Sequence, residues 1–405
     1  MMNKNEFRCN ICKSDKIKIL HTIPGYPMCG GPMAKSGADS KIKRDKIMLG
    51  FCSRCGSCSL VYPSSEDLAA KIYDSSYTSS NMAVALGAAI DEKRRNFIEL
   101  VKGLNLARGA RMLEIGCYDG SLLMQFKKMG FDTSGCEPSP MAKIGIKKYG
   151  LDIKNDYFSA DLYAPDYFDI VILRNVLEHI PYPVSFLCSV RKVLKRGGFI
   201  AIEVPDGQKR IAEGILGSIV PEHPNYFGDY NLKMIFYACG FSEFRIKKQP
   251  GSILLAAQKN TLPGEKLPLK LRLAPPKILK KFLNSYRSGI NKNLERHAKT
   301  LAILKNEIKN GRKVIIFGAN THSLELLVQE SIKRDWVLCA IDDDPVKWER
   351  RIVVFKISVH PRKMLKNYKN YVLVICSYFS QNNIIHSLTK ELPHLPKIIK
   401  AYPGG

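Results

Sequence analysis

Two pairs of cysteines have the spacing of metal ligands. Cys9 and Cys12 form one C-x-x-C pair and Cys52 and Cys55 form another, with 39 residues between the pairs. Each pair can direct two thiolates at one ion, and two pairs complete the tetrahedral sulfur set that zinc prefers in structural sites. We therefore predict structural zinc, because four sulfur ligands leave no open position for water. Cys58 extends the second pair to C-x-x-C-x-x-C, so it is either an alternative ligand or a core residue.

A glycine-containing turn follows a predicted buried strand. In LEIGCYDG, Glu114, Gly116 and Gly120 form the pattern E-x-G-x-x-x-G. Glycines at a strand-to-helix turn let the backbone approach a ligand closely. Glu137 ends the next predicted strand, where a carboxylate can accept both hydroxyls of a ribose. Tyr118 stands where the dinucleotide fingerprint requires glycine, so the pattern favours an adenosine cofactor without a pyrophosphate, namely S-adenosylmethionine.

Three polar residues extend this candidate cofactor site. Asp119 lies within the glycine turn, where it would either hold the loop or face the methionine amine of the cofactor. Asn175 and His179 follow the fourth predicted strand, in FDIVILRNVLEHIP. The alternative for His179 is an ordinary helix residue whose ring is hydrogen-bonded within the fold.

Strands and helices alternate in two separate parts of the chain. ARMLEIG, FDTSGCEP, DYFDIVILRN and FIAIEVPD are predicted strands separated by helices, and RKVIIFGA, WVLCAIDDD and YVLVICS form a second, shorter series. Such alternation predicts a parallel sheet with helices on both faces. The fold class is therefore α/β. Together with the cysteine pairs and the S-adenosylmethionine pattern, we expect a small N-terminal zinc module, a Rossmann-like domain of the class I methyltransferase type and a second, smaller Rossmann-like C-terminal domain.

These changes of pattern give the expected domain boundaries. We expect a zinc-binding module at residues 1–70, an S-adenosylmethionine-dependent methyltransferase domain at 71–260, a basic linker at 261–290 and the C-terminal Rossmann-like domain at 291–405. The linker prediction depends on EKLPLKLRLAPPKILKKFLNSYR, in which prolines interrupt a weakly amphipathic pattern. A contact with a membrane surface is the less favoured interpretation of this segment.

Composition limits the compartment and the partners. The chain of 405 residues is 45% hydrophobic and lacks both a run of eighteen apolar residues and the apolar middle of a signal peptide, so we expect a cytoplasmic protein. Its twelve cysteines are then expected to be reduced, which disfavours disulfides. A redox pair is disfavoured because neither C-x-x-C opens a helix in a βαβ unit. A net charge of +26 indicates an anionic partner, although no nucleic-acid fold signature is present. We expect a monomer that uses neither nucleic acid nor a membrane as its main partner.

With these motifs in this order, the sequence resembles the three-domain, zinc-containing sugar C-methyltransferases, which use S-adenosylmethionine to methylate C-3 of nucleotide-linked keto-sugars. The resemblance covers nearly the whole chain and includes the four cysteines of the two C-x-x-C pairs together with Glu114, Gly116, Gly120, Glu137 and Asn175. It adds Tyr77 in YDSSYTSS, and Glu222 and His223 in PEHPNYF. It implies that zinc folds a small module that presents residues 73–80 toward the transferred methyl group.

The implied reaction forms a carbon–carbon bond, which requires a base next to a ketone. His223 is suited to take the proton, with Glu222 beside it to assist or tune it. Tyr77 could donate a hydrogen bond to the developing oxyanion. The alternative for His223 is an ordinary turn residue, because it lies between Pro221 and Pro224.

The chain also departs from the family pattern. Val220 stands where the family usually has a tyrosine, two residues before the Glu-His pair. In FGANTHSLELL only Gly318 remains of the glycines that the family prefers, although Asp342 still matches the acidic strand end. The methyltransferase class is therefore better supported than a particular sugar.

A nucleotide-linked sugar or another anionic small molecule is the expected substrate, since Lys or Arg near the cleft between the two α/β units would attract its phosphates. Tyr73, Tyr226 and Phe227 are candidates to stack on the base, with packing as the alternative. Three other functions remain open. The first is O- or N-methylation of a glycan or another small polar substrate, the second a catalytically inactive zinc-stabilised binding protein, and the third methylation of nucleic acid.

Overall fold

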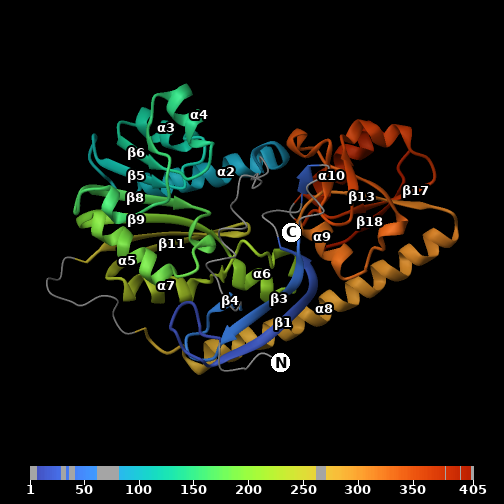
Figure 1. Cartoon of the computed structure of the whole chain (residues 1–405), viewed down its shortest axis with the longest axis horizontal. Helices are drawn as coiled ribbons and strands as arrows, with labels where there is room; N and C mark the ends of the chain where they lie inside the picture. Colours follow the sequence, from blue (N-terminus) through green and yellow to red (C-terminus); the bar gives the residue numbers. More distant parts are fainter. Residues whose placement is uncertain are drawn as a thin grey trace.

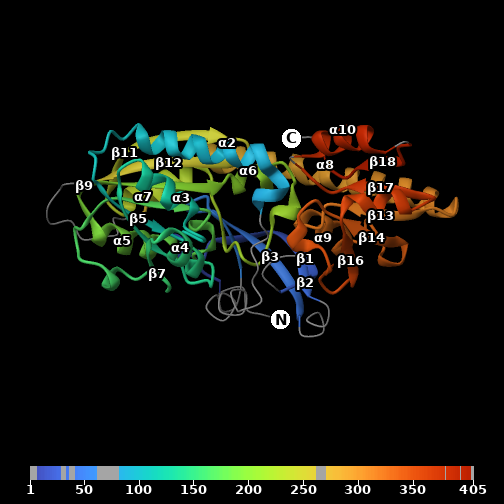
Figure 2. The same ribbon diagram turned by 90° about the horizontal axis from the view of Figure 1, so that it is seen from above.

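A computed structural model describes most of the 405-residue chain. The described residues are 7–28, 33–35, 42–61, 82–260, 271–378, 380–392 and 394–402. Figure 1 shows two α/β units side by side, with strands of the N-terminal segment between them and the long helix α8 (Pro276–Lys309) running beneath the second unit. Figure 2 shows the same arrangement from above. Each unit is built on its own sheet.

The first unit is a seven-stranded sheet with one antiparallel strand. Its order is β11-β12-β9-β8-β5-β6-β7, and β12 pairs antiparallel with both of its neighbours. The strands are β5 (Arg111–Ile115), β6 (Asp132–Cys136), β7 (Asp152–Lys154), β8 (Phe168–Arg174), β9 (Leu194–Pro205), β11 (Phe241–Gln249) and β12 (Ser252–Lys259). The chain reverses its direction across the sheet between β5 and β8, and ligands of such folds bind at the carboxyl ends of strands at this point.

Helices cover both faces of this sheet, which explains its nearly continuous apolar strands. Neighbouring residues of a strand point to opposite faces, so Met112 packs in one core cluster and Leu113 in another. The first cluster includes residues of α2 (Met82–Lys102), α3 (Ser121–Lys128) and α4 (Ala142–Tyr149). The second includes residues of α5 (Pro183–Val193) and α7 (Asp229–Ala238). The expected Rossmann-like domain is confirmed.

The second unit is also built on a seven-stranded sheet, of order β18-β17-β13-β14-β16-β15-β2. Its strands are β2 (Met33–Lys35), β13 (Lys313–Phe317), β14 (Val337–Ile341), β15 (Arg350–Ile352), β16 (Ile357–His360), β17 (Tyr371–Ile375) and β18 (Lys397–Lys400). The core of one face includes residues of α8 and α9 (Thr321–Val328), and the core of the other includes Leu388 of α10 (Gln381–Glu391). This confirms the second Rossmann-like unit.

The N-terminal segment is joined to both units by strand pairing. Strands β1 (Ile17–Pro27), β3 (Arg44–Cys52) and β4 (Cys58–Leu60) form a small sheet that β10 (Asn225–Tyr226) of the first unit completes. In turn, β2 of the N-terminal segment pairs antiparallel with β15 at the edge of the second sheet. The N-terminal segment therefore fixes the first and second units relative to one another.

Helix α8 begins inside the segment that the sequence predicts as a linker, so that prediction is wrong for residues 276–290. Pro275 is the N-cap and Pro276 is the first helical residue, a position where the missing N–H of proline costs nothing. These prolines therefore mark the beginning of a helix, and they do not interrupt an amphipathic pattern as predicted. Phe282 then stacks on Phe51 of β3, with ring centroids 5.1 Å apart.

A close helix crossing joins the two α/β units directly. Helix α6 (Gly207–Ala212) of the first unit meets α8 at Gly289, where an added Cβ would lie 2.2 Å from the carbonyl oxygen of Ala212. Asn293 Nδ2 donates to the carbonyl oxygen of Gly214 at 2.7 Å. The crossing thus requires glycine and is fixed by a buried hydrogen bond. In the described part of the chain, no helix combines the length and the apolar character needed to cross a membrane.

Candidate active site and metal centre

Four cysteine sulfurs converge beside the end of strand β3. Cys9 Sγ lies 3.6 Å from Cys55 Sγ, and Cys12 Sγ lies 3.6 Å from Cys52 Sγ. All four sulfurs are within 4.8 Å of one another. A tetrahedral zinc site with bonds of about 2.3 Å places its sulfurs about 3.8 Å apart. The four predicted ligands therefore come together with separations that fit zinc.

The two C-x-x-C turns have matching backbone geometry. The residue after each pair, Lys13 or Gly56, has a left-handed backbone with φ of 59° or 71°. Ser57 Oγ lies 3.2 Å from Cys9 Sγ and 3.0 Å from Cys55 Sγ, close enough to donate a hydrogen bond to a thiolate. Such an outer partner orients metal ligands.

Cys58 lies outside this group. It is buried in β4 within a core cluster that also contains Ile47 and Leu49, whereas the four ligand candidates belong to, or pack against, a different core cluster. Burial raises the pKa of its thiol. Of the two roles that the sequence leaves open, the structure therefore favours the core residue.

The glycine turn lies at the point where the first sheet reverses its order. Gly116 and Gly120 have φ values of 74° and 71°, and an added Cβ on Gly116 would lie 2.5 Å from Val176 Cγ2. The turn between β5 and α3 is therefore packed directly against the segment that follows β8. This contact brings residues 114–120 together with residues 175–179.

Two carboxyl groups border this turn. Glu137 Oε2 accepts from the backbone N–H of Tyr118 at 3.0 Å, and Oε1 accepts from that of Ser139 at 2.9 Å. Glu114 is buried, and its Oε2 has no hydrogen-bond partner among the described residues. Burial raises the pKa of Glu114 to about 8. An unsatisfied buried carboxyl oxygen next to a glycine turn fits a polar ligand such as S-adenosylmethionine.

The other predicted cofactor residues have different roles. Asp119 Oδ1 accepts from the backbone N–H of Ser121 at 3.0 Å, so its side chain holds the start of α3. Asn175 has a left-handed backbone with φ of 53° at the end of β8, and its backbone N–H donates to the carbonyl oxygen of Glu203 at 2.8 Å. The Asn175 side chain is exposed at the carboxyl edge of the sheet, next to the glycine turn.

A carboxylic acid and two imidazoles form the second cluster of this site. The rings of His179 and His223 meet edge to face, with centroids 4.6 Å apart. Glu178 joins them, and the three groups have ligand atoms within 4.8 Å of one another. His179 Nδ1 lies 2.9 Å from the carbonyl oxygen of Glu222, which can only accept, so Nδ1 carries the hydrogen.

Burial sets the protonation of this cluster. It lowers the pKa of His179 to about 4 and raises the pKa of Glu178 to about 8. It also lowers the pKa of His223 well below the ordinary value, and the nearby His179 and Arg210 lower it further. At neutral pH the His223 imidazole is therefore uncharged, and one of its two ring nitrogens carries no hydrogen.

The loop that carries His223 is held by backbone contacts. The hydroxyl of Tyr226 accepts from the backbone N–H of Val220 at 3.0 Å and lies 3.3 Å from its carbonyl oxygen. Tyr226 and Phe227 are buried, so they pack in the core and are not placed to stack on a base. Glu222 supplies its carbonyl oxygen to His179, a backbone role that its residue type does not reveal.

Two tyrosines of the predicted site, Tyr73 and Tyr77, lie outside the described residues. Conversely, the structure adds two residues that the sequence analysis missed. Glu178 is recognisable only as the neighbour of His179 in the chain. Arg210 of α6 acts electrostatically on both Glu178 and His223, and no motif marks it.

The corresponding turn of the second sheet is filled by the chain itself. Asp342 follows β14, and its Oδ2 accepts from the backbone N–H of Ala319 and from Lys347 Nζ, both at 2.9 Å. Asn320 Oδ1 accepts from the backbone N–H groups of His322 and Ser323 at the start of α9. The positions where a nucleotide would bind a Rossmann-like sheet are thus occupied by protein groups.

Comparisons with known proteins match the two α/β units to two different domain families. Residues 89–242 match a methyltransferase domain, and residues 280–401 match a C-methyltransferase C-terminal domain. The ubiquinone biosynthesis O-methyltransferase of Ruegeria sp. (strain TM1040) is 31% identical over 119 residues, which are 28% of this chain and 48% of that enzyme. That of Roseobacter denitrificans is 32% identical over 97 residues, 22% of this chain and 39% of the enzyme. The chain spans about half or less of the length of these relatives.

Two solved structures are similar to part of this chain. The CurJ carbon methyltransferase has a TM-score of 0.34 and 16% identity, covering 41% of this chain and 54% of that chain. A SAM-dependent methyltransferase from Archaeoglobus fulgidus has a TM-score of 0.34 and 18% identity, covering 42% and 98%. The two domain matches show that the chain carries a methyltransferase domain at residues 89–242, followed by a C-methyltransferase C-terminal domain at residues 280–401.

Proposed function

We propose that this chain transfers a methyl group from S-adenosylmethionine to a carbon atom next to the ketone of a nucleotide-linked sugar. The observation that carries the proposal is the cluster of buried Glu178 with the partly buried His179 and His223. Glu178 and His179 follow β8 at the carboxyl edge of the methyltransferase sheet, and His223 joins them from a distant segment. The match of residues 280–401 to a C-methyltransferase domain supports transfer to carbon.

The chain's part in the reaction is to remove a proton and hold the resulting enolate. The uncharged imidazole of His223 takes the proton from the carbon next to the ketone, leaving a carbanion equivalent. His179 fixes the position of that ring by edge-to-face contact, since its own Nδ1–H is held by the carbonyl oxygen of Glu222. Tyr77 remains the proposed donor to the enolate oxygen.

The cofactor would be held at the glycine turn by the residues around Gly116 and Gly120. Glu137 would accept the ribose hydroxyls, and the unpartnered oxygen of Glu114 would face a donor of the cofactor. When bound there, S-adenosylmethionine supplies an electrophilic methyl group. The contact of Val176 with Gly116 places the start of the histidine cluster beside this turn.

A zinc ion held by Cys9, Cys12, Cys52 and Cys55 would have a structural role. Such an ion would link the N-terminal loop to the end of β3, and through it the strands that pair with both α/β units. Elemental analysis of the purified chain is expected to find one zinc per chain. Cys52→Ser should lose this zinc and unfold at lower temperature; an unchanged unfolding temperature would exclude the structural role.

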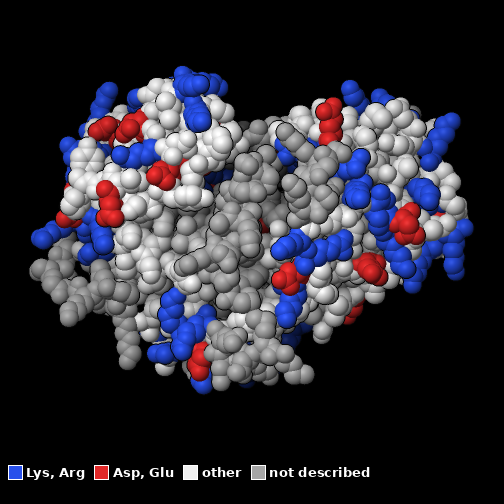
Figure 3. All heavy atoms as spheres, viewed as in Figure 1, with Lys and Arg blue, Asp and Glu red and all other residues white. Residues whose placement is uncertain are grey.

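The anionic substrate accounts for the charge of the chain. Figure 3 shows Lys and Arg side chains spread over both α/β units, with Asp and Glu in smaller scattered groups. A net charge of +26 would raise the local concentration of a nucleoside diphosphate near the protein.

Hydrogen exchange tests the enolate directly. The chain is incubated in D₂O with nucleotide-linked keto-sugars and S-adenosylhomocysteine, which cannot give up a methyl group. We expect one deuterium to enter the sugar next to the ketone faster than without protein, and His223→Asn to abolish this exchange. Exchange at the protein-free rate for every sugar tested would contradict the proposal.

Methyl transfer to oxygen is the second candidate function. It is favoured by the curated relatives, which are named O-methyltransferases, and by Val220 in place of the family tyrosine. This chemistry needs no enolate, so it predicts methyl transfer without deuterium exchange. An inactive binding protein would instead show no heat of S-adenosylmethionine binding in a calorimetric titration.

A further inference from the structure

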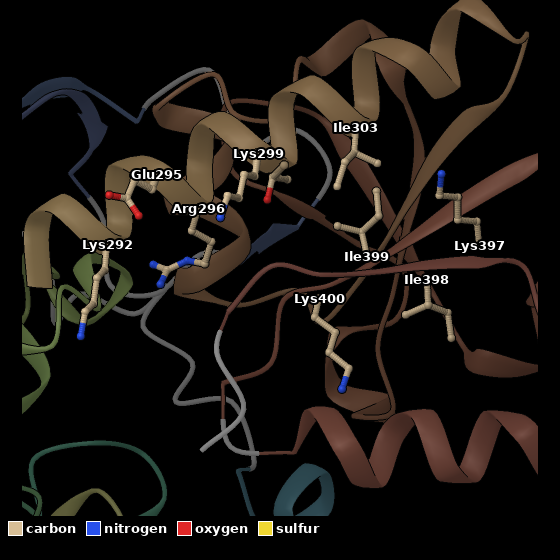
Figure 4. A pocket seen from close by; sticks show the side chains of 10 residues that line it. Lys292, Glu295, Arg296, Lys299, Ile303, Lys397, Ile398, Ile399 and Lys400 are labelled. Carbon is tan, nitrogen blue, oxygen red and sulfur yellow. The ribbon is translucent and has the colours of Figure 1, made fainter.

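A basic groove lies on the second unit, away from the residues proposed for methyl transfer. It has a volume of about 430 Å³ and is formed by helix α8 and the edge strand β18. Figure 4 shows side chains of α8 on the side that faces the strand, with Ile303 and Ile399 turned toward one another. A groove of this size can hold a small ligand.

The groove is strongly positive. Its lining includes five cationic side chains and one carboxylate, and the cations are Lys292, Arg296, Lys299, Lys397 and Lys400. The three cations of α8 are spaced by four and three residues, so they lie on one face of the helix. Like charges on one face destabilise a helix unless an opposite charge lies nearby. Glu295, the one carboxylate of the lining, lies three residues from Lys292 and four from Lys299 and offsets only part of this charge. The remaining excess of cations indicates an anionic ligand.

The chain neutralises only part of this charge. Lys397 Nζ lies 2.6 Å from Glu307 Oε1, and Lys400 Nζ lies 3.1 Å from Asn382 Oδ1. By contrast, Nε and Nη2 of Arg296 are buried and have no hydrogen-bond partner among the described residues. Buried N–H donors are nearly always satisfied in folded proteins. The Arg296 guanidinium therefore lacks the acceptor that a ligand could supply.

The position of Arg296 favours phosphate as that acceptor. Its guanidinium lies over the ring of Tyr402, with Cζ 5.0 Å from the ring centroid. This contact fixes the orientation of the guanidinium plane. A planar guanidinium makes paired hydrogen bonds to phosphate oxygens, and neighbouring lysines add charge. Ile303 and Ile399 offer an apolar surface beside these cations. The usual nucleotide position of this sheet is filled by Asn320 and Asp342, so it does not compete.

We propose that this groove binds a ligand that carries a diphosphate group, such as a nucleoside diphosphate, through Arg296 and the lysines of α8. The site is separate from the methyl-transfer proposal, since none of its residues belongs to the glycine turn or the histidine cluster. A binding measurement alone tests this proposal, whether or not the chain methylates a sugar.

Calorimetric titration of the full chain tests the groove, with uridine diphosphate and inorganic pyrophosphate as probes. Arg296→Met is expected to weaken binding of both probes about tenfold or more, because it removes charge-assisted hydrogen bonds. Lys299→Met, a change at an exposed residue, should weaken it less and keeps the test valid if Arg296→Met fails to fold. Lys305→Met is the matched control, since Lys305 lies on the opposite side of α8 and should leave binding unchanged.

The outcomes separate the sources of the anion. Equal affinity for pyrophosphate and uridine diphosphate supports a site for the diphosphate alone, and tighter binding of the nucleotide supports a nucleotide site. His223→Asn should bind both probes as the unmodified chain does, because His223 does not line the groove. Equal affinities in all α8 variants would overturn the proposal. So would binding only to vesicles of phosphatidylglycerol.

Discussion

In each of the two seven-stranded sheets of this chain, an acidic residue follows the second strand of the α/β series. The groups that donate hydrogen bonds to this residue differ between the two sheets. Glu137 follows the second strand of the first unit and accepts only backbone N–H groups in the described structure. Asp342 follows the second strand of the other unit and accepts from Lys347 as well as from backbone. A cation from the chain itself therefore satisfies Asp342, whereas the hydrogen bonds to the Glu137 side chain come from backbone N–H groups of the described residues.

The glycine turns differ in the same way. Gly116 touches Val176 of the segment that leads to the histidine cluster, so the turn and the cluster form one site. The space after Gly318 is occupied by Asn320, which caps α9 and also donates to the carbonyl oxygen of Cys376. A Rossmann-like sheet can therefore be a binding domain or a scaffold, depending on a few side chains at its carboxyl edge.

His223→Asn should break the function of the first unit most completely. Removing the base is expected to lower kcat about 10²- to 10⁴-fold, while leaving the Kd for S-adenosylmethionine unchanged. The control is His386→Asn, an exposed histidine of α10 in the second unit. A rate within threefold of that of the unmodified chain would remove His223 from the mechanism.

Gly116→Val compared with Gly318→Ala tests the two turns. A side chain at Gly116 would collide with Val176 Cγ2 at 2.5 Å, so we expect S-adenosylmethionine to bind about 100-fold more weakly, as measured by calorimetry. Gly318 has a φ of 100°, so alanine there should reduce the unfolding free energy by about 1 kcal/mol without affecting cofactor binding. Equal effects on the cofactor would show that the second turn also binds it.

Glu137→Gln compared with Asp342→Asn tests the two acidic residues. Loss of the Glu137 charge should weaken S-adenosylmethionine binding about tenfold, because hydrogen bonds to charged groups are the stronger ones. Asp342→Asn leaves buried Lys347 without its partner, so it should lower stability by about 3 kcal/mol in urea unfolding and leave cofactor affinity unchanged. Weaker cofactor binding in Asp342→Asn would contradict the scaffold role.

The pH profile gives the smallest effect. Burial lowers the pKa of His223 well below 6.5, so its proton-accepting form persists as the pH falls below that value. We expect the acid limb of kcat/KM to have its midpoint below pH 6, and Arg210→Met to move it upward because a nearby positive charge is lost. The groups that face His223 are His179, Glu178 and Arg210. An acid limb centred near pH 6.5 in the unmodified chain would show that His223 is not buried in solution.

The sequence predicts short-range chemistry better than long-range pairing. The four cysteines, the glycine turn and the succession of two α/β units along the chain follow from spacing and periodicity, and the structure brings the sulfurs within 4.8 Å of one another. The strand pairing that joins the N-terminal segment to both units depends on strands of two and three residues, which are too short to show a periodic pattern in the sequence. Lys347 could not be assigned to Asp342, because an ion pair depends on the turn between them.

The start of helix α8 and the role of Glu178 differ from the sequence-based predictions for physical reasons. Pro275 and Pro276 suggest a broken pattern, yet they stand at the one end of a helix that tolerates proline. Glu178 cannot be recognised from the sequence, because a buried carboxylic acid leaves no mark there other than its neighbour His179. Its role becomes visible only when residues of two distant segments, 178–179 and 223, meet.

The most direct measurement of the central claim is the position of the transferred methyl group. The chain is incubated with S-adenosylmethionine labelled with ¹³C at the methyl carbon and with nucleotide-linked keto-sugars, and the products are examined by mass spectrometry and carbon NMR. We predict that the labelled methyl is bonded to the carbon next to the ketone. A labelled methyl on oxygen, or no labelled sugar from any substrate of the panel, would contradict this function.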